Sequence, residues 1–237
     1  MRIQAGVLAL AAAGALLSHA APAAAQQTLN LSLGYFAVRG EDARVDGDVL
    51  TENLNVRRFQ IGDFNGAAVG AEWLVPLGEY LEAGAGFGFS RRTVPSVYDK
   101  FIDDDGSEIE QRMRLRLMPI AFTVRVLPLR QTSPVQPYVG AGLAVLGWRY
   151  SETGEFVDFT RRNAIFREQY VASGSATGPV VVGGLRFAGD AASGGFEIRY
   201  QRADAPLGHP FSLAQRDPRI DLGGWTYQVT MGWRFAR

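Results

Sequence analysis

Few side chains in this sequence could catalyse a reaction, and the only candidates for a general base are His19 and His209. His209 lies in LGHPFSLAQRD, where Ser212 and Asp217 follow it as a nucleophile and a carboxylate partner. General base catalysis needs a rigidly positioned side chain. Because His209 precedes a proline in a long polar segment, we expect a solvated loop histidine and no enzyme.

Charged residues also occur inside segments that are otherwise apolar or small: Glu72, Glu82, Arg125, Arg186, Glu197, Arg199 and Arg234. An unpaired charge is costly to bury, whereas bidentate arginine–carboxylate bonds offset that cost. We therefore predict a buried charge network, with a polar conduit for ions or small solutes as the alternative. The sequence contains no cysteine, and no motif in it predicts a metal or a cofactor.

One polar segment of the chain, EFVDFTRRNAIFREQY, is rich in aromatic residues. Such groups do not remain free in water, so we expect the segment to extend a hairpin or to fold onto a larger body. A ligand pocket is the alternative, and its lining would be Phe156, Phe159, Phe166 and Tyr170.

The first 25 residues predict a secretory signal peptide, with Arg2, an apolar run over residues 5–17 and a small-residue cleavage site that ends at Ala25. The run of about 13 apolar residues is shorter than the roughly 20 that a membrane-spanning helix requires. Cleavage leaves residues 26–237 as one domain and removes His19. The 24 basic and 24 acidic residues balance, which argues against nucleic acid as a partner.

The rest of the chain repeats short stretches in which apolar residues alternate with small or polar ones, as in two-sided β-strands. We predict eight strands, at residues 28–39, 67–77, 81–90, 112–127, 137–150, 181–187, 196–201 and 224–235. The apolar parity of the fourth changes at Met118 and Pro119. Proline cannot donate to a ladder, so we predict a one-residue bulge there.

The connections alternate between short turns and long polar loops, the latter over residues 40–66, 93–111, 151–177 and 202–221. An even number of strands with this sorting of loops is typical of an up-and-down transmembrane β-barrel of the bacterial outer membrane. A secreted barrel of the lipocalin kind is the competing architecture, and it would carry its apolar face inward.

The last strand, WTYQVTMGWRF, favours the membrane barrel. From Trp225 to Phe235 it spans about 33 Å, and a tilt of about 40° projects this to about 25 Å, the height of a lipid-facing band. Aromatic residues fall at both ends of such a band. The turn-end girdle is Trp73, Phe187, Phe196, Trp233 and Phe235, and the loop-end girdle is Tyr35, Phe87, Phe89, Tyr200, Trp225 and Tyr227.

The signal peptide, the eight strands, the stretch VQPYVGAGLAV and the aromatic last strand resemble the small outer-membrane β-barrel proteins of the OmpA-transmembrane, opacity and OmpW-like kind. The resemblance implies the outer membrane of a Gram-negative bacterium. It also implies contact with outer-membrane lipids and lipopolysaccharide, and insertion by the machinery that reads the C-terminal strand. In that family the final aromatic usually ends the chain, whereas Ala236 and Arg237 follow it here. We expect a monomer.

An eight-stranded barrel is just wide enough for side chains to fill its interior. We therefore expect an integral outer-membrane protein of structural or surface-interaction type. A narrow conduit or lateral transporter for small hydrophobic or polar solutes is the alternative. A lipid A-modifying enzyme that uses His209 is less favoured. Outer-membrane enzymes of that kind also resemble this sequence in fold class.

Overall fold

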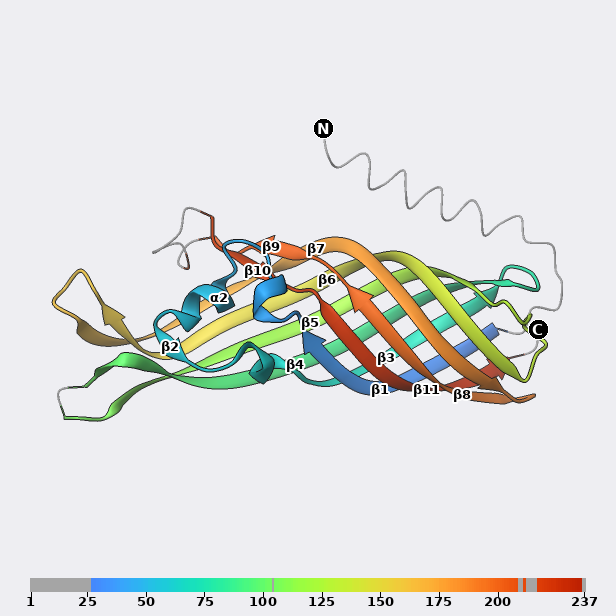
Figure 1. Cartoon of the computed structure of the whole chain (residues 1–237), viewed down its shortest axis with the longest axis horizontal. Coiled ribbons are helices and arrows are strands. Elements are labelled where there is room, and N and C mark those ends of the chain that lie inside the picture. Colours follow the sequence, from blue (N-terminus) through green and yellow to red (C-terminus); the bar gives the residue numbers. More distant parts are fainter. Residues whose placement is uncertain (1–26, 104, 209–210, 212–216, 236–237) are drawn as a thin grey trace, which may run out of the picture.

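Eight antiparallel strands close into a barrel in the computed structural model, which describes residues 27–103, 105–208, 211 and 217–235. The order around the barrel follows the chain, and the last strand pairs with the first (Figure 1). The strands are β1 (Gln27–Val38), β3 (Gly66–Pro76), β4 (Leu81–Ile102), β5 (Glu108–Val126), β6 (Val135–Asp158), β7 (Ala164–Ala188), β8 (Ala192–Gln201) and β11 (Gly224–Phe235). The predicted fold class is confirmed; the signal peptide lies outside the described residues.

The barrel wall is tall on one side and low on the other. Strands β4 to β7 contain 19 to 25 residues, whereas β1, β3, β8 and β11 contain 10 to 12. The two hairpins of the tall side project beyond the rest of the barrel at its loop end (Figure 1). Residues 93–111 and 151–177 are therefore mostly strand, and the prediction of long loops there is wrong. The aromatic segment does extend a hairpin, as expected, because β6 and β7 pair as far as Asp158 and Ala164.

The predicted bulge at Met118 and Pro119 is also wrong. Strands β5 and β6 pair without a shift from Val126↔Val139 to Gln111↔Gly154. The change of apolar parity is instead a change of face. Met113, Leu115 and Leu117 point into the barrel and are at most 4% exposed, whereas Ile120 and Phe122 point outward and are about half exposed. The outward positions beyond Pro119 carry Arg112, Arg114 and Arg116.

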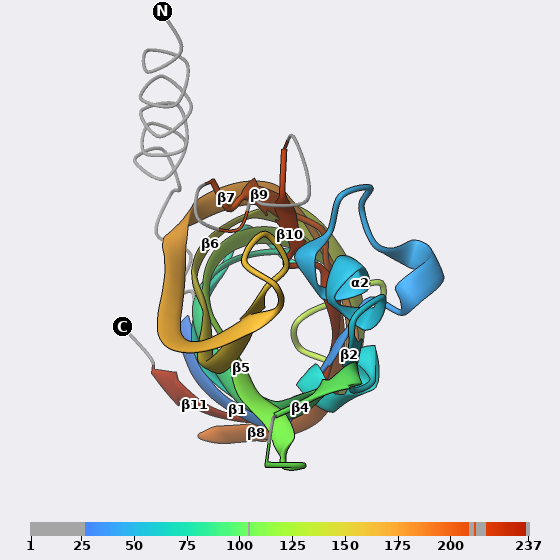
Figure 2. The same ribbon diagram turned by 90° about the vertical axis from the view of Figure 1, so that its left-hand side faces the viewer.

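Two long connections leave the low side of the wall and cover the loop end of the barrel (Figure 2). Residues 39–65 form the first connection, and the second follows β8. Their elements are η1 (Glu41–Ala43), α2 (Val49–Leu54), β2 (Arg57–Arg58), η2 (Ile61–Phe64), β9 (Asp204–Pro206) and β10 (Arg219–Asp221). The Asp48 side chain caps α2 by accepting a hydrogen bond from the Thr51 N–H at 3.2 Å. No helix in the described parts of the chain is both long and apolar enough to cross a membrane.

An apolar core lies between these connections and the inner face of the tall wall. Leu50 of α2 is fully buried and Phe64 of η2 is 2% exposed. The wall supplies its own apolar side chains to the same cluster: Val94, Met113, Leu115, Leu117, Leu146, Trp148, Val180 and Val182. The loop-end half of the molecule is therefore built like a soluble domain, apolar inside and polar outside.

Strand β6 approaches β5 too closely at Gly142 for any side chain. A Cβ at that position would lie 1.8 Å from the carbonyl oxygen of Phe122, a backbone atom that cannot move alone. We predict that Gly142→Ala lowers the free energy of unfolding by about 1–3 kcal/mol, the usual cost of overpacking. Urea unfolding in detergent micelles, followed by tryptophan fluorescence, measures this change. The control is Gly183→Ala on β7, where the nearest atom is 3.9 Å away; equal midpoints for both variants would contradict the prediction.

Candidate functional site in the barrel lumen

A cluster of ion pairs crosses the lumen in the membrane-spanning half of the barrel. Arg125 of β5 is fully buried at its centre. Its Nη2 donates to a carboxylate oxygen of Glu72 on β3 and, at 2.8 Å, to Oε2 of Glu197 on β8. These three strands lie on different sides of the barrel, so the cluster bridges its interior.

Two further arginines complete the cluster. Arg199 Nη2 lies 2.9 Å from Oε1 of Glu197 and 3.3 Å from Oε1 of Glu72. Arg186 Nη2 lies 2.9 Å from Oε2 of Glu82, and Arg125 Nη1 is 3.9 Å from the other oxygen of Glu82. Six of the seven residues predicted for a charge network therefore meet in the lumen: Glu72, Glu82, Arg125, Arg186, Glu197 and Arg199. The seventh, Arg234, donates to the carbonyl of Gly189 at the turn end instead.

Neutral side chains also form hydrogen bonds within the cluster, two of them to Glu197. The Tyr138 hydroxyl donates to Oε2 of Glu197 at 2.9 Å, and Gln228 donates to Oε1 at 2.8 Å. Gln136 accepts from Nε of Arg186 at 2.8 Å, and the Arg125 guanidinium lies 4.7 Å from the centre of the Tyr138 ring. All three neutral residues have inward parity on their strands. Parity was the signal that could have identified them.

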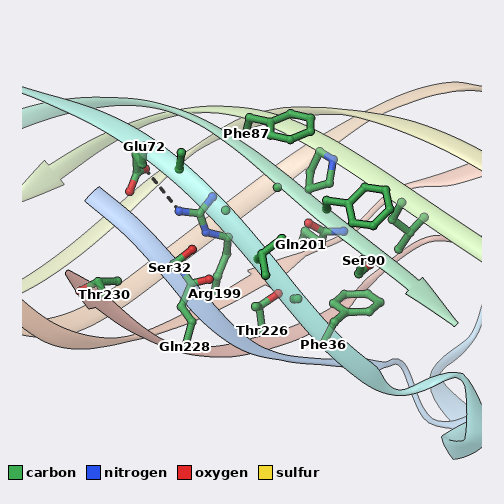
Figure 3. Close-up of a pocket in the computed structure, with 18 of the residues that line it drawn as sticks. Ser32, Phe36, Glu72, Phe87, Ser90, Arg199, Gln201, Thr226, Gln228 and Thr230 are labelled. Atoms are coloured by element: carbon green, nitrogen blue, oxygen red, sulfur yellow. Dashed lines mark hydrogen bonds and ion pairs between the residues drawn. The ribbon is translucent and has the colours of Figure 1, made fainter. Parts of the chain in front are cut away.

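A cavity of about 50 Å³ lies beside the cluster, between β1, β3, β4, β8 and β11. Arg199, Gln228 and Ser32 line it on the polar side, and Phe36 lies at its loop end (Figure 3). At roughly 10–15 Å³ for each water, the cavity has room for about four. Inward side chains of β5, β6 and β7 pack in the same part of the barrel and are at most 2% exposed: Leu117, which also lines the cavity, and Ala121, Ala144, Leu146, Val180 and Val182. Side chains therefore occlude the lumen.

A second polar cluster is buried in the loop-end half, beneath α2. Glu152 of β6 accepts from Arg57 Nη1, Asn53 Nδ2 and the Tyr150 hydroxyl at 2.7–2.8 Å. Burial raises the pKa of the Tyr150 hydroxyl, and the adjacent Glu152 carboxylate raises it further, so this hydroxyl stays protonated and donates. This cluster was not predicted, because Arg57 and Glu152 fall in segments of the sequence that were expected to be loops.

The two covering connections are joined to each other by charge. Arg44 Nε lies 2.5 Å from Oδ2 of Asp48, and Arg44 Nη2 donates to the Asp221 carbonyl at 2.9 Å. Asp48 Oδ1 accepts from the Asp221 N–H at 2.8 Å, and the Asp221 carboxylate binds Arg39 Nη1 at 2.8 Å. Residues more than 170 positions apart in the chain are thereby held together over the mouth of the barrel.

The aromatic residues predicted for a mouth pocket pack against one another. The Phe156 ring stacks on Phe166 with centroids 5.8 Å apart and meets Tyr170 edge-on at 4.7 Å, while Phe159 contacts Phe101 at 5.4 Å. Phe156 is buried, whereas Phe159 is exposed. None of the four lines the cavity beside the lumen cluster, or a smaller cavity that Phe64 and Arg92 line. Neither cavity supports the predicted pocket, which stays a prediction.

The residues predicted for the lipid-facing girdles point away from the lumen. Trp225 lies against Tyr200 with ring centroids 4.7 Å apart, and Tyr35 is the direct neighbour of Tyr227 across the β1–β11 pair. Phe196 lies near the middle of β8, opposite Val229. Phe89 and Tyr200 are partly buried, and the others are between 42% and 63% exposed: Tyr35, Trp73, Phe87, Phe187, Phe196, Trp225, Tyr227, Trp233 and Phe235.

Most of the segment predicted to hold the catalytic candidates lies outside the described residues, His209 and Ser212 among them. Within the residues that the structure does describe, no group of three or more His, Asp or Glu side chains could hold a metal ion.

The fold and the outward apolar band define an integral β-barrel protein of the bacterial outer membrane. No family model and no curated protein matches the sequence. Among solved structures, the outer membrane protein OprG from Pseudomonas aeruginosa is similar, with a TM-score of 0.54 and 12% identity over 90% of this chain and 97% of that chain.

Two other small barrels also match. Neisserial surface protein A has a TM-score of 0.47 and 10% identity over 89% of this chain and 97% of that chain. The E. coli outer membrane protein W has a TM-score of 0.42 and 13% identity over 91% of this chain and the whole of that chain. At these identities the likeness is one of fold. The outward apolar band is what a barrel that spans a membrane requires.

Arg125 is the residue on which the lumen cluster depends. We predict that Arg125→Met lowers the free energy of unfolding by about 3–5 kcal/mol, because it removes the most buried cation of the cluster and leaves Arg199 alone to pair with the carboxylates of Glu72 and Glu197. Urea unfolding in detergent micelles measures the loss. Arg130→Met is the control, since Arg130 pairs with Glu79 in an exposed turn, and it should change stability little. A loss no larger for Arg125→Met than for this control would contradict the role assigned to Arg125.

Proposed function

We propose that the protein is a closed outer-membrane barrel that acts at the cell surface, as an anchor and display scaffold for its loop-end half. The observation that carries the proposal is the occluded lumen. Among the described residues, a cluster of buried ion pairs and an apolar layer fill the barrel interior, and two connections pack on the apolar layer. Catalysis has no part in the proposal.

The loop-end half is suited to display because it is a folded body. The hairpins β4–β5 and β6–β7 extend the wall beyond the membrane, and their inward side chains pack on α2 and η2. Since short turns are periplasmic in such barrels and long loops are external, this half faces outward from the cell. A rigid extension presents a fixed surface to other molecules, which costs less conformational entropy on binding than a free loop would.

The partners inferred from the sequence remain predictions. The alternating β11 strand, with Phe235 near its end, has the character of the signal that the barrel-insertion machinery reads. Outer-membrane lipids and lipopolysaccharide are the expected neighbours of the apolar band. A monomer is the expected state.

Conductance tests whether the barrel is closed. We predict that the purified protein in planar bilayers gives no discrete openings above leak. The Arg125→Ala variant should also give no openings, because the apolar layer that includes Leu117 and Val182 lies beyond the charge cluster. A stable open level in the wild-type protein would contradict a closed scaffold and favour a conduit for ions or small polar solutes. A porin incorporated under the same conditions serves as the control for insertion.

Lateral release of a small hydrophobic solute into the membrane is the second candidate function, and one local feature favours it. Strand β4 pairs with β5 up to Phe87↔Ile120 and again from Ser90↔Leu117. Between these pairs, Gly88 and Phe89 face Met118 and Pro119 without ladder pairing, and proline has no N–H to donate. The cavity of about 50 Å³ borders this gap, since Gly88, Phe89 and Pro119 are among its lining residues.

A disulfide across the gap tests this second function, and the absence of native cysteine makes the experiment clean. In cells that express Phe89→Cys/Met118→Cys, lateral transfer predicts that oxidation slows uptake of a long-chain alcohol by at least about threefold and that reduction restores it. The two single-cysteine variants are the controls. Uptake that is the same in the oxidised and reduced states would remove lateral transfer and leave the closed scaffold.

A further inference from the structure

A row of arginines crosses the outer surface of the tall wall. Arg91 of β4 lies directly opposite Arg116 of β5, and Arg116 lies directly opposite Arg149 of β6. Directly opposed residues on one face have Cβ atoms about 4.5–5.5 Å apart. Arg116 and Arg149 point outward, because their neighbours Leu117 and Trp148 are buried inside, and Arg91 has the same parity on β4 as the outward Phe87. Arg114 and Arg112 follow Arg116 on the same face of β5, and we call these five residues the arginine patch.

The patch lacks acidic partners in the part of the chain that the structure describes. Among the ion pairs of the described residues none involves Arg91, Arg112, Arg114, Arg116 or Arg149. The one hydrogen bond from a patch side chain goes from Arg114 Nε to the Thr93 hydroxyl at 3.1 Å. Arg116 Nε is buried and has no hydrogen-bond partner. Like charges directly opposite each other destabilise a sheet, so this arrangement calls for an anion from outside the chain.

The position of the patch identifies the anion. On β4, Phe89 lies two residues before Arg91. On β6, Gly147 lies two residues before Arg149, and the exposed Val145 lies two residues further towards the membrane. Two residues of strand correspond to about 7 Å. The row therefore lies immediately outside the apolar band, at the level where the phosphate groups of an outer-leaflet glycolipid follow its acyl chains.

The chemistry of the side chain fits the same ligand. A guanidinium offers paired N–H donors in a planar fork that matches two phosphate oxygens, and it keeps its charge at any physiological pH. Three such forks side by side can share one or two phosphates. The long arginine stems can meanwhile lie along the apolar surface beneath them.

We infer that the arginine patch is a binding site for the phosphate groups of lipopolysaccharide, which fixes this glycolipid against the β4–β6 wall. The site adds a lipid-specific contact to the closed scaffold and does not depend on whether the lumen conducts. It also explains why three like charges are tolerated in register: the bound phosphates neutralise them.

The test compares the binding of lipopolysaccharide to the full-length protein and to two triple variants in phosphatidylcholine nanodiscs. Arg91→Gln/Arg116→Gln/Arg149→Gln should raise the Kd by at least about tenfold, because hydrogen bonds between charged groups are lost. The control, Arg161→Gln/Arg162→Gln/Arg167→Gln, removes the same charge from the tip of the β6–β7 hairpin and should change the Kd by less than about twofold. Heat-modifiable gel mobility verifies that both variants are folded.

Two further arms identify the ligand. Lipopolysaccharide stripped of its phosphates should bind wild-type protein as weakly as the intact lipid binds the patch variant. Soluble tripolyphosphate, at the same phosphate concentration, should fail to displace the lipid. Equal affinity of the patch variant and the wild-type protein would overturn the site. Full displacement by tripolyphosphate would overturn the lipid as its ligand and assign the patch to a free anion.

Discussion

A β-strand sends successive side chains to opposite faces, and this structure depends on what happens when the medium on one face changes partway along the strand. In the membrane-spanning half, lipid lies outside, so Ile120 and Phe122 point out while Arg125 points in. Beyond the membrane, water lies outside, so Arg116 points out while Leu115 and Leu117 point in. The register of β5 against β6 does not change, because an exchange of residue types between the two faces is sufficient.

The closed lumen follows from the same exchange. Once the inward face becomes apolar, it must be covered, and the low strands β1, β3, β8 and β11 cannot cover it. The connections that leave those strands do so instead, with Leu50 and Phe64 in the apolar core and the Arg44–Asp48–Asp221 contacts holding the two connections together. The interior is therefore a stack of layers: ion pairs, then apolar packing, then the cluster around Glu152.

Where the medium outside a strand is the same along its whole length, the sequence predicts the position and the outward face of that strand well. The strand from Trp225 to Phe235 has lipid on one side throughout, and its alternation gave its position and its outward face. The hairpins β4–β5 and β6–β7 were predicted wrongly because a single medium was assumed outside the whole length of each strand. Under that assumption, the change of face at Pro119 was interpreted as a bulge. Inward parity was enough to predict the residues of the lumen cluster. Which arginine meets which glutamate depends on the register around the closed barrel, and no single strand carries that information.

The near-exclusive use of arginine, with Lys100 as the single lysine, serves two opposite situations in this molecule. Inside, Arg125, Arg186 and Arg199 face Glu72, Glu82 and Glu197, so charge is balanced within the chain and the planar fork can serve two carboxylates at once. Outside, Arg91, Arg116 and Arg149 have the same fork but no carboxylate. The chain itself supplies the negative charge that balances the inner arginines. The negative charge that balances the outer arginines must come from the surroundings, and at the edge of the apolar band these are the phosphates of the outer leaflet.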